Sequence, residues 1–444
     1  MQKERWRDLL LLAVSYFFYM AWYWEYSGLL ALSTLVDFLL GLAISRTEDQ
    51  ARRKRLLLVS LALNLGVLAT FKYFNFFAEI STSVITFFGT HINLPRSKLL
   101  LPVGISFYTF QSLSYTIDVY RRTIPAEKNF TKFALYVSFF PQLVAGPIVR
   151  AVDFLPQLRK PISVGRGDFD RGLALVFIGL FKKVIIGDTL AVLAVDAVFK
   201  NPTGYSSWDL LIALYSYAFQ IYCDFSGYSD MAIGCAGMMG FWLPMNFNRP
   251  YLSQNMREFW TRWHMSLSTW LKDYLYISMG GNRKGESKTR RNLLVTMLLG
   301  GLWHGAALNF ILWGAWHGIL LAVTPKPRKD NVPSLWSVWF GRFLTFQLVC
   351  FGWLLFRVSN MSQFVTYMKG LLRFQGGTVL HIYVYIFLIL AFALHVFPKK
   401  LQDHLVMVLW PTKSRWLHAL VYAALLLLSV GFTLDAPAFI YFQF

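Results

Sequence analysis

Long apolar runs without a charged residue recur along the whole chain, and they limit what it can fold into. A helix needs about 20 mostly apolar residues to cross the ~30 Å hydrocarbon layer of a bilayer. Only 15% of the 444 residues are charged, whereas soluble domains carry about 25%. We therefore predict an all-α, polytopic membrane protein with about ten to twelve membrane segments, in a single membrane-embedded domain over residues 1–444. The uncharged runs are residues 9–24, 56–70, 99–115, 210–222, 293–323, 343–356, 382–396 and 417–432, and the runs 29–44 and 173–198 contain internal charges.

The net charge of +20 could indicate a nucleic-acid partner, but the positive residues are distributed in another way. They cluster in short loops between apolar runs, which is the pattern of cytoplasmic loops in membrane proteins. We expect these loops to contact anionic membrane lipids, and we expect no nucleic acid. The turn at residues 81–95 has no Lys or Arg and is expected on the outer side. The basic clusters are residues 52–55, 121–122, 283–291, 326–329 and 399–400.

The cysteines and the absence of repeats exclude some alternatives. Cys223, Cys235 and Cys350 lie in apolar surroundings and have no disulfide or metal-ligand spacing, so we expect no metal. No internal repeat is evident, which weakens the interpretation as an inverted-repeat transporter. The first apolar run is followed by no A-x-A-like cleavage site, so we expect an anchor and not a removed signal peptide.

Two segments combine apolar residues with features that break helices. Broken backbone is tolerated in a membrane only where it is packed in protein or lines a cavity. Residues 139–148 contain Pro141 and Pro147, and residues 223–234 contain Asp224 and Asp230. We predict that both segments are re-entrant or kinked elements beside a water-filled space. The two carboxylates are expected mainly as buried acceptors for Tyr, Ser or Arg groups.

Residues 256–278 form an amphipathic segment rich in tryptophan. On a helical period, Trp260, Trp263 and His264 share one apolar face, and charged residues occupy the other. Such a helix is typical of the membrane interface or of the mouth of a helix bundle. We predict one helix that directs His264 into the protein.

Residues 292–324 form a run of 33 residues without Lys, Arg, Asp or Glu, and it contains two Trp-His-Gly triplets, at His304 and His317. The run is long for one membrane span and short for two. We predict a helix pair broken near residues 305–309, or one long kinked helix. In a straight helix the two histidines would lie about 20 Å apart, so one would be catalytic and the other supportive.

Histidines at membrane depth suggest proton transfer, because titratable groups are costly there. Acyl transfer from a thioester to a hydroxyl needs a base, and apolar burial keeps imidazole in the neutral, competent form. The developing oxyanion needs donors, for which Trp303, Asn309 and His264 are the candidates. The alternative is that a membrane histidine only bonds neighbouring helices, and this alternative stays open for His317. The remaining histidines, His381, His395, His404 and His418, are expected in loops or interfaces, and His91 in an external loop.

Four ordered motifs occur in the second and third quarters of the chain: FFPQLVAGPI at 139–148, DFSGYSDMAIG at 224–234, NFNRPYLSQNMREFWTRWHMSLSTWLKDYLYISMGG at 246–281 and LLGGLWHGAALNFILWGAWHG at 298–318. They resemble those of the membrane-bound O-acyltransferases, in particular the bacterial branch that O-acetylates alginate and peptidoglycan. The resemblance extends from about residue 30 to the end, although relatives commonly begin with a further hydrophobic stretch.

The resemblance implies a fold and a site. The expected fold is a ring of about 11 tilted transmembrane helices, with re-entrant and interfacial helices, around a central tunnel. His304 matches the family's near-invariant histidine, and His264 matches its second active-site position. From the resemblance together with the polar or aromatic character of the residues, we expect six further residues along the tunnel: Trp303, Asn309, His317, Asp224, Trp260 and Trp263. Arg257, Arg262, Arg283 and Lys284 are expected at a cytoplasmic mouth for an anionic donor.

The predicted function is a membrane O-acetyltransferase in the bacterial inner membrane. It would move an acetyl group from acetyl-CoA or an acyl-carrier thioester across the membrane, with no bound cofactor, for O-acetylation of an exported polysaccharide such as alginate or peptidoglycan. The resemblance also implies a periplasmic or surface SGNH-type partner. Two alternatives remain open: a transporter or flippase for a lipid-linked sugar or acyl carrier, and a non-catalytic anchor for an outside enzyme.

Overall fold

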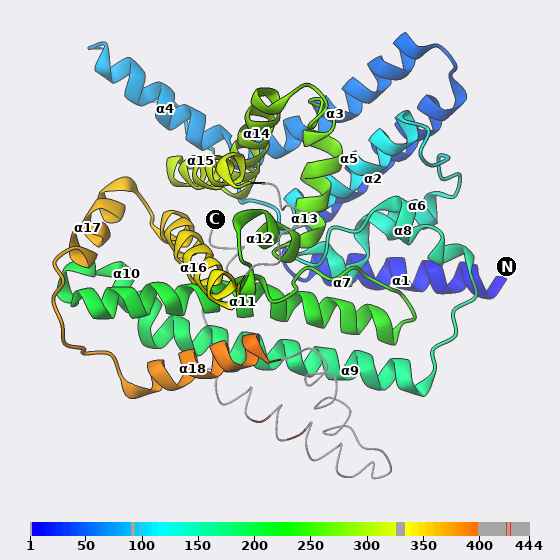
Figure 1. Ribbon diagram of the computed structural model, residues 1–444. Coiled ribbons are helices and arrows are strands. Elements are labelled where there is room, and N and C mark those ends of the chain that lie inside the picture. The colour runs from blue at the N-terminus through cyan, green and yellow to red at the C-terminus, as the bar shows by residue number, and fades with distance from the viewer. Residues whose placement is uncertain are drawn as a thin grey trace. The chain divides into compact units, whose positions relative to one another are not determined.

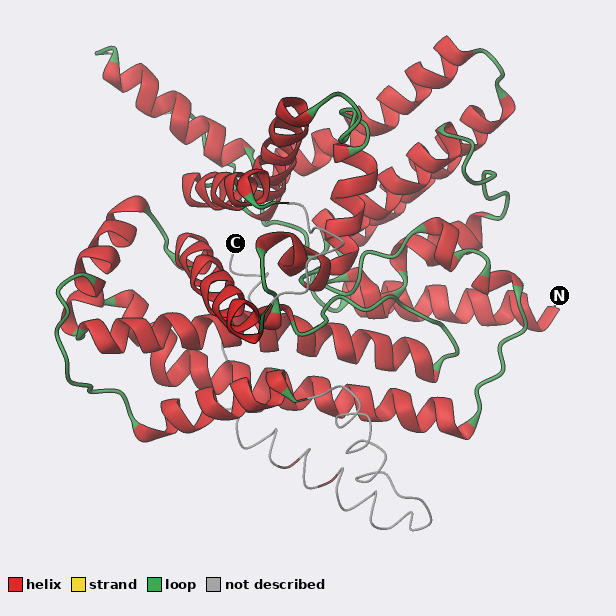
Figure 2. Cartoon of the chain, in the orientation of Figure 1, coloured by secondary structure: helices red, strands yellow, loops and turns green. Residues whose placement is uncertain are grey.

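The computed structural model describes residues 2–89, 94–97, 99–325 and 334–397, together with residues 423 and 427. All regular structure in these residues is helical (Figure 2). They fall into two compact units, Met1–Gly165 with Met239–Pro244, and Arg166–Met238 with Met245–Phe444. That the chain forms one domain stays a prediction. The basic clusters at 326–329 and 399–400, His91, His404, His418 and most of the run 417–432 lie outside the described residues.

The first unit is built on helices that share buried polar contacts. Asp37, fully buried on α2, accepts hydrogen bonds from Ser60 Oγ at 2.6 Å and from Asn64 Nδ2 at 2.8 and 3.0 Å, both on α3. A buried carboxylate is tolerated only when such donors satisfy it. The helices are α1 (Gln2–Met20), α2 (Glu25–Arg46), α3 (Gln50–Lys72), α4 (Phe74–Phe87), α5 (Ile105–Tyr120), α6 (Phe130–Ser138), α7 (Phe140–Leu143), α8 (Ala151–Phe154) and η1 (Gln157–Arg159).

The predicted break at residues 139–148 is confirmed, whereas the water-filled space expected beside it stays a prediction. The chain leaves α6 at Ser138, forms only the four-residue helix α7, and then runs without regular structure to α8. Pro141 stands in the first turn of α7, where its missing N–H costs nothing. The segment is packed within the unit, since Phe139, Leu143 and Ala145 are fully buried.

The second unit holds the remaining helices and contains every predicted site residue, in these helices or in the turns between them. Long α11 lies beside the continuous helical stretch of α9, η2 and η3 (Figure 1). The elements are α9 (Arg166–Leu180), η2 (Phe181–Asp188), η3 (Ala191–Val195), α10 (Asp196–Lys200), η4 (Pro202–Gly204), α11 (Ser207–Met238), η5 (Pro250–Leu252), α12 (Met256–Arg262), α13 (Met265–Trp270), η6 (Leu271–Tyr276), α14 (Glu286–His304), α15 (Leu308–Val323), α16 (Leu335–Arg357), α17 (Met361–Leu371) and α18 (Ile382–Val396).

The prediction of a re-entrant or kinked element at residues 223–234 is wrong. These residues lie inside α11, which runs unbroken for 32 residues. The glycines of α11 allow close contact with a neighbouring helix and do not bend α11. A Cβ on Gly227 or Gly234 would overlap the backbone carbonyl oxygens of Gly179 and Gly172 on α9. We call these four residues the glycine seam. It lets two helix backbones approach more closely than any larger residue permits.

The membrane character of the chain rests on its apolar helices. Among the described residues, three helices are long and apolar enough to cross a bilayer: α2, α3 and α16. Helices α15 and α18 are apolar but shorter. Each unit also exposes large apolar side chains, such as Phe17 and Trp336, whose exposed fractions are 73% and 79%. Lipid is the environment that suits such surfaces.

Candidate active site

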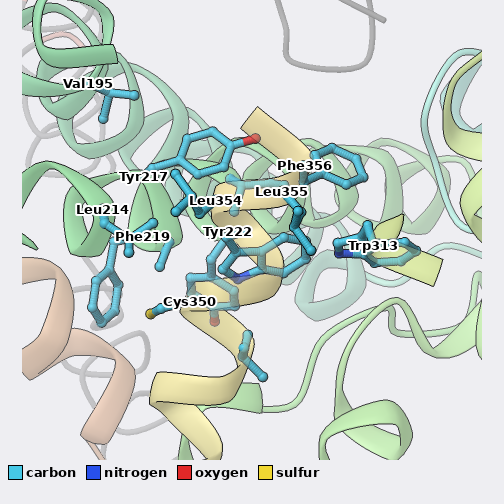
Figure 3. Close-up of a cluster of buried hydrophobic side chains, with 14 of the residues drawn as sticks. Val195, Leu214, Tyr217, Phe219, Tyr222, Trp313, Cys350, Leu354, Leu355 and Phe356 are labelled. Atoms are coloured by element: carbon cyan, nitrogen blue, oxygen red, sulfur yellow. The ribbon is translucent and has the colours of Figure 1, made fainter. Parts of the chain in front are cut away.

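The candidate site lies in the aromatic core of the second unit. Figure 3 shows Trp313 of α15 beside Phe356 of α16, with Tyr217 and Tyr222 of α11 in the same cluster. The ring centroids of Trp313 and Phe356 are 5.5 Å apart. Rings of this size account for much of a core's apolar burial and pack best in tilted or edge-on contacts.

The uncharged run at 292–324 folds as the predicted helix pair. Helix α14 ends at His304 and α15 begins at Leu308, so the break falls inside the expected interval. The two helices pack closely because small residues face each other. A Cβ on Gly301 would overlap the carbonyl oxygen of Phe310, and one on Gly314 would overlap that of Met297.

The α14–α15 helix pair brings both Trp-His-Gly histidines, His304 and His317, into contact with the ring of Trp313. The Trp313 centroid lies 5.1 Å from that of His304 and 4.8 Å from that of His317. The separation expected for a straight helix therefore does not apply, because the chain reverses between the two triplets. His304 is 9% exposed and His317 is fully buried.

The prediction of one helix over residues 256–278 is wrong. Helix α12 ends at Arg262, α13 begins at Met265, and η6 continues from Leu271 in a wider π-helical turn. Between α12 and α13, His264 has a left-handed backbone with φ of 41°. Few non-glycine residues adopt this conformation, and it persists only where neighbouring contacts hold it.

Asn246 supplies those contacts. Its backbone carbonyl accepts a hydrogen bond from Met265 N at 2.9 Å. Its side-chain Oδ1 accepts from Ser266 Oγ at 2.6 Å and from Ser266 N at 3.3 Å, and its Nδ2 donates to Ser229 Oγ on α11 at 3.2 Å. Asn246 thus ties the start of α13 to α11 and fixes the backbone at His264.

The imidazole of His264 is buried and packs near two aromatic rings, those of Phe225 and Trp303. The His264 centroid lies 4.6 Å from that of Phe225 at an interplanar angle of 89°, and 6.5 Å from that of Trp303. Trp303 in turn lies 4.8 Å from His304. One indole therefore adjoins both predicted catalytic histidines, which come from separate elements. His264 faces the protein interior, as predicted, and is 1% exposed.

Trp260 on α12 and Trp263, which directly follows this helix, lie in the same aromatic core. Trp260 contacts His317 at 5.3 Å and Trp313 at 5.8 Å between centroids. Trp263 packs against Trp353 of α16 at 4.7 Å. Both are buried.

Asn309 has bonds of its own. Its Nδ2 donates to the carbonyl oxygens of Leu355 and Val358 at the end of α16, at 3.3 and 2.9 Å. These bonds occupy the donors that an oxyanion would need. In this arrangement Asn309 holds α15 to α16, and a role toward substrate stays a prediction.

Asp224 belongs to a buried charged network between α11 and η2. Lys183 Nζ lies 2.5 Å from Asp224 Oδ1 and 2.7 Å from Asp188 Oδ1, while Lys182 Nζ lies 2.6 Å from Asp230 Oδ2. We expected Tyr, Ser or Arg groups as partners of the two α11 carboxylates. The ion-pair partners are the two lysines, because η2 directs consecutive residues toward α11.

The four basic residues predicted at a donor mouth fall into two groups. Arg257 donates to the carbonyl oxygens of Thr324 and Leu321 at the end of α15, and Arg262 pairs with Glu258 at 2.6 Å. Arg283 and Lys284 are exposed in the turn between η6 and α14. That the four surround one mouth stays a prediction.

One further histidine differs from expectation. His395 was expected in a loop or interface, but it is 3% exposed on α18, and its Nε2 accepts a hydrogen bond from Tyr251 N at 3.1 Å. His381 is exposed at the start of α18, in agreement with its expected place.

Sequence reasoning missed Asn246, Trp313 and Phe225 as parts of the site. Each lies within or beside a quoted motif, but their roles depend on contacts between distant segments. No group of His, Cys, Asp or Glu residues that could hold a metal ion occurs in the part of the chain that the structure describes.

Comparisons with known proteins agree with the motifs. Residues 16–325 match the membrane-bound O-acyltransferase family. A probable alginate O-acetylase of Pseudomonas putida is 44% identical over 361 residues, covering 81% of this chain and 73% of that protein. A peptidoglycan O-acetyltransferase of Helicobacter pylori is 35% identical over 406 residues, covering 84% and 75%. A teichoic acid D-alanyltransferase of Bacillus subtilis is 30% identical over 284 residues, covering 59% and 70%. This chain therefore belongs to the membrane-bound O-acyltransferase family and is an acyltransferase.

Proposed function

We propose that the chain is an O-acetyltransferase of the bacterial inner membrane, which moves acetyl groups from a cytoplasmic thioester for the O-acetylation of an exported polysaccharide. The relatives named for alginate and peptidoglycan O-acetylation support the acetyl group and the polymer. One observation carries the assignment of the site. Two buried histidines, His264 and His304, come from different elements and adjoin the same indole, that of Trp303.

In the proposed reaction His304 is the general base. Its imidazole takes the proton from the acceptor hydroxyl while the hydroxyl oxygen attacks the thioester carbonyl. The tetrahedral intermediate then collapses, the carbon–sulfur bond breaks, and the imidazolium returns its proton to the leaving thiolate, which restores the neutral base. His264 and the Trp303 indole would orient the thioester or stabilise the oxyanion.

The finer architecture belongs to this proposal. A ring of about 11 tilted helices around a tunnel would let the donor enter from the cytoplasm and the acetyl group leave on the outer side. The exposed Arg283 and Lys284 suit the phosphates of coenzyme A or of a phosphopantetheine carrier. An SGNH-type partner outside the membrane would complete transfer to the polymer. Transport without chemistry is not favoured, since the relatives are named for acyl transfer.

The first experiment replaces the base. We expect His304→Gln and His304→Ala to lower acetyl transfer by about 100-fold or more, because they remove general-base catalysis. Acetyl content of the exported polymer and acetyl-CoA consumption by the purified protein measure this. His381→Ala is the matched control, since His381 is exposed, caps α18 and has its ring contact with Tyr383 of the same helix. Normal acetylation by both His304 variants would reject the assignment.

The second experiment separates the chemistry of His264 from its backbone. His264→Asn is the informative change, because Asn adopts left-handed φ more readily than other non-glycine residues. We expect partial loss of activity with unchanged thermal stability. Full activity in His264→Asn would show that the imidazole has no part in transfer.

A further inference from the structure

Three buried rings in the second unit contact one another in a triangle. Trp260, Trp313 and His317 have centroid separations of 5.8 Å (Trp260 to Trp313), 5.3 Å (Trp260 to His317) and 4.8 Å (Trp313 to His317). They come from α12 and α15, and their exposed fractions are 8%, 1% and 0%. We call this group the ring triangle.

Every ring nitrogen of the triangle is buried without a hydrogen-bond partner among the described residues. This holds for Nε1 of both tryptophans and for Nδ1 and Nε2 of His317. The neighbouring rings of the core differ. Trp316 Nε1 donates to Leu348 O at 2.9 Å, and Trp353 Nε1 donates to Tyr251 OH at 3.1 Å. Buried polar groups nearly always have partners, so several unpaired nitrogens in one place require an explanation.

The nitrogens define the kind of ligand that would satisfy them. Each indole offers one donor and no acceptor, and a neutral imidazole offers one donor and one acceptor. An anion or a carbonyl group would leave the imidazole acceptor unused. A hydroxyl group can donate to the imidazole and accept from an indole. None of the three rings carries a fixed charge, which also favours a neutral ligand.

We propose that the ring triangle is a binding site for a hydroxyl group, either of a water molecule or of the acyl acceptor. His317 accepts the hydroxyl proton in a hydrogen bond, and an indole N–H donates to the oxygen. Trp313 also contacts His304 edge-on at 5.1 Å, so the bound hydroxyl lies one ring away from the proposed base. Its part in catalysis rests on the proposed function, but its binding does not.

The tight packing around His317 limits the size of the side chain that position 317 can hold. A Cβ on Gly352 of α16 would lie 2.6 Å from His317 Nε2, so a larger ring at position 317 would clash. The test therefore uses the flexible, nearly isosteric pair His317→Met and His317→Gln. Gln keeps one donor and one acceptor at the end of the side chain, whereas Met keeps neither.

The measurement is the thermal unfolding temperature of the purified full-length protein. With a bound hydroxyl, we expect H317Q to unfold at least about 2 °C above H317M. The matched control is Met297→Gln at a buried position of α14 in the same core, where the amide has no ligand and should lower the unfolding temperature. If H317Q unfolds at a lower temperature than H317M, as expected for the Met297→Gln control against the wild type, the triangle is only a packed aromatic cluster and the proposal fails.

A kinetic arm distinguishes the two sources of the hydroxyl. With acetyl-CoA and an alginate oligosaccharide as the acceptor probe, H317M should raise KM for the probe about tenfold relative to H317Q if the acceptor hydroxyl binds there. If H317M instead lowers kcat relative to H317Q and leaves KM unchanged, the bound hydroxyl belongs to a water molecule held in the triangle. If the wild-type protein consumes no acetyl-CoA even in membranes that also contain its outer partner, the proposed function is rejected, yet the unfolding temperatures still decide the binding site.

Discussion

At the scale of single residues, Asn246 explains why His264 can occupy its unusual backbone conformation. One residue uses its main chain and both side-chain polar atoms to join α11 to the start of α13. The histidine itself has no glycine-like freedom, so its conformation is imposed from outside. Loss of this tie would remove the hydrogen bonds that Ser229 and Ser266 form with Asn246.

We therefore expect Asn246→Ala to lower the free energy of unfolding by about 2 kcal/mol and to lower acetyl transfer about tenfold. Thermal unfolding and acetyl-CoA consumption measure the two effects. Asn248→Ala is the control, because the exposed Asn248 bonds through its backbone N to Arg262 O, and its side chain makes no hydrogen bond within the described part of the chain. Equal behaviour of the two variants would contradict the role given to Asn246.

At the scale of elements, the glycine seam determines how closely α9 and α11 approach. Gly172 and Gly179 on α9 oppose Gly234 and Gly227 on α11, seven residues apart on each helix. Seven residues make about two helical turns, so both pairs fall on one face. The seam holds the α11 surface that presents Phe225 and Ser229 to the His264 segment.

We expect Gly227→Ala to destabilise the protein by about 1–3 kcal/mol, because the added methyl group forces two backbones apart. Gly237→Ala lies in the same helix with nothing within 4 Å of the new Cβ. That control should be neutral or slightly stabilising, since Ala favours helix over Gly. Thermal unfolding compares them, and a stable Gly227→Ala would show that the seam tolerates separation.

The sequence predicts some of these elements and not others, for physical reasons. The break after His304 was predictable because 33 uncharged residues exceed one membrane span. The break at His264 was not, since it depends on hydrogen bonds from Asn246, 18 positions earlier. The kink predicted at residues 223–234 was inferred from two carboxylates in an apolar segment, and the sequence does not reveal that the glycines of this segment pack against α9. The pairing of Lys183 with Asp224 depends on the π-helical turn of η2, which no local pattern signals.

At the scale of the whole molecule, the charge distribution predicts which loops face the cytoplasm. The exposed turn at Arg283 and Lys284 is strongly basic, whereas residues 81–95 include no Lys or Arg; of these, residues 81–87 continue helix α4 and do not form the expected turn. Positive loops stay on the cytoplasmic side during membrane insertion. The same orientation would bring the basic turn to a cytoplasmic thioester.

Cysteine labelling tests this orientation. In a Cys235→Ser background, we expect Lys284→Cys to react with a membrane-impermeant maleimide only in inverted vesicles, and Ser81→Cys only in intact spheroplasts. Cys223 and Cys350 are buried and should stay unlabelled. Labelling of both new cysteines from the same side would overturn the assigned topology.

The end of α14 has an electrostatic consequence. His304 is the last residue of this 19-residue helix, and aligned peptide dipoles leave roughly half a negative elementary charge at a helix carboxyl end. A positive charge that forms on the imidazole during acyl transfer thus meets an opposite field already in place. Because His304 is buried, solvent screens this field only weakly, and the field acts on the cation without any side chain having to move.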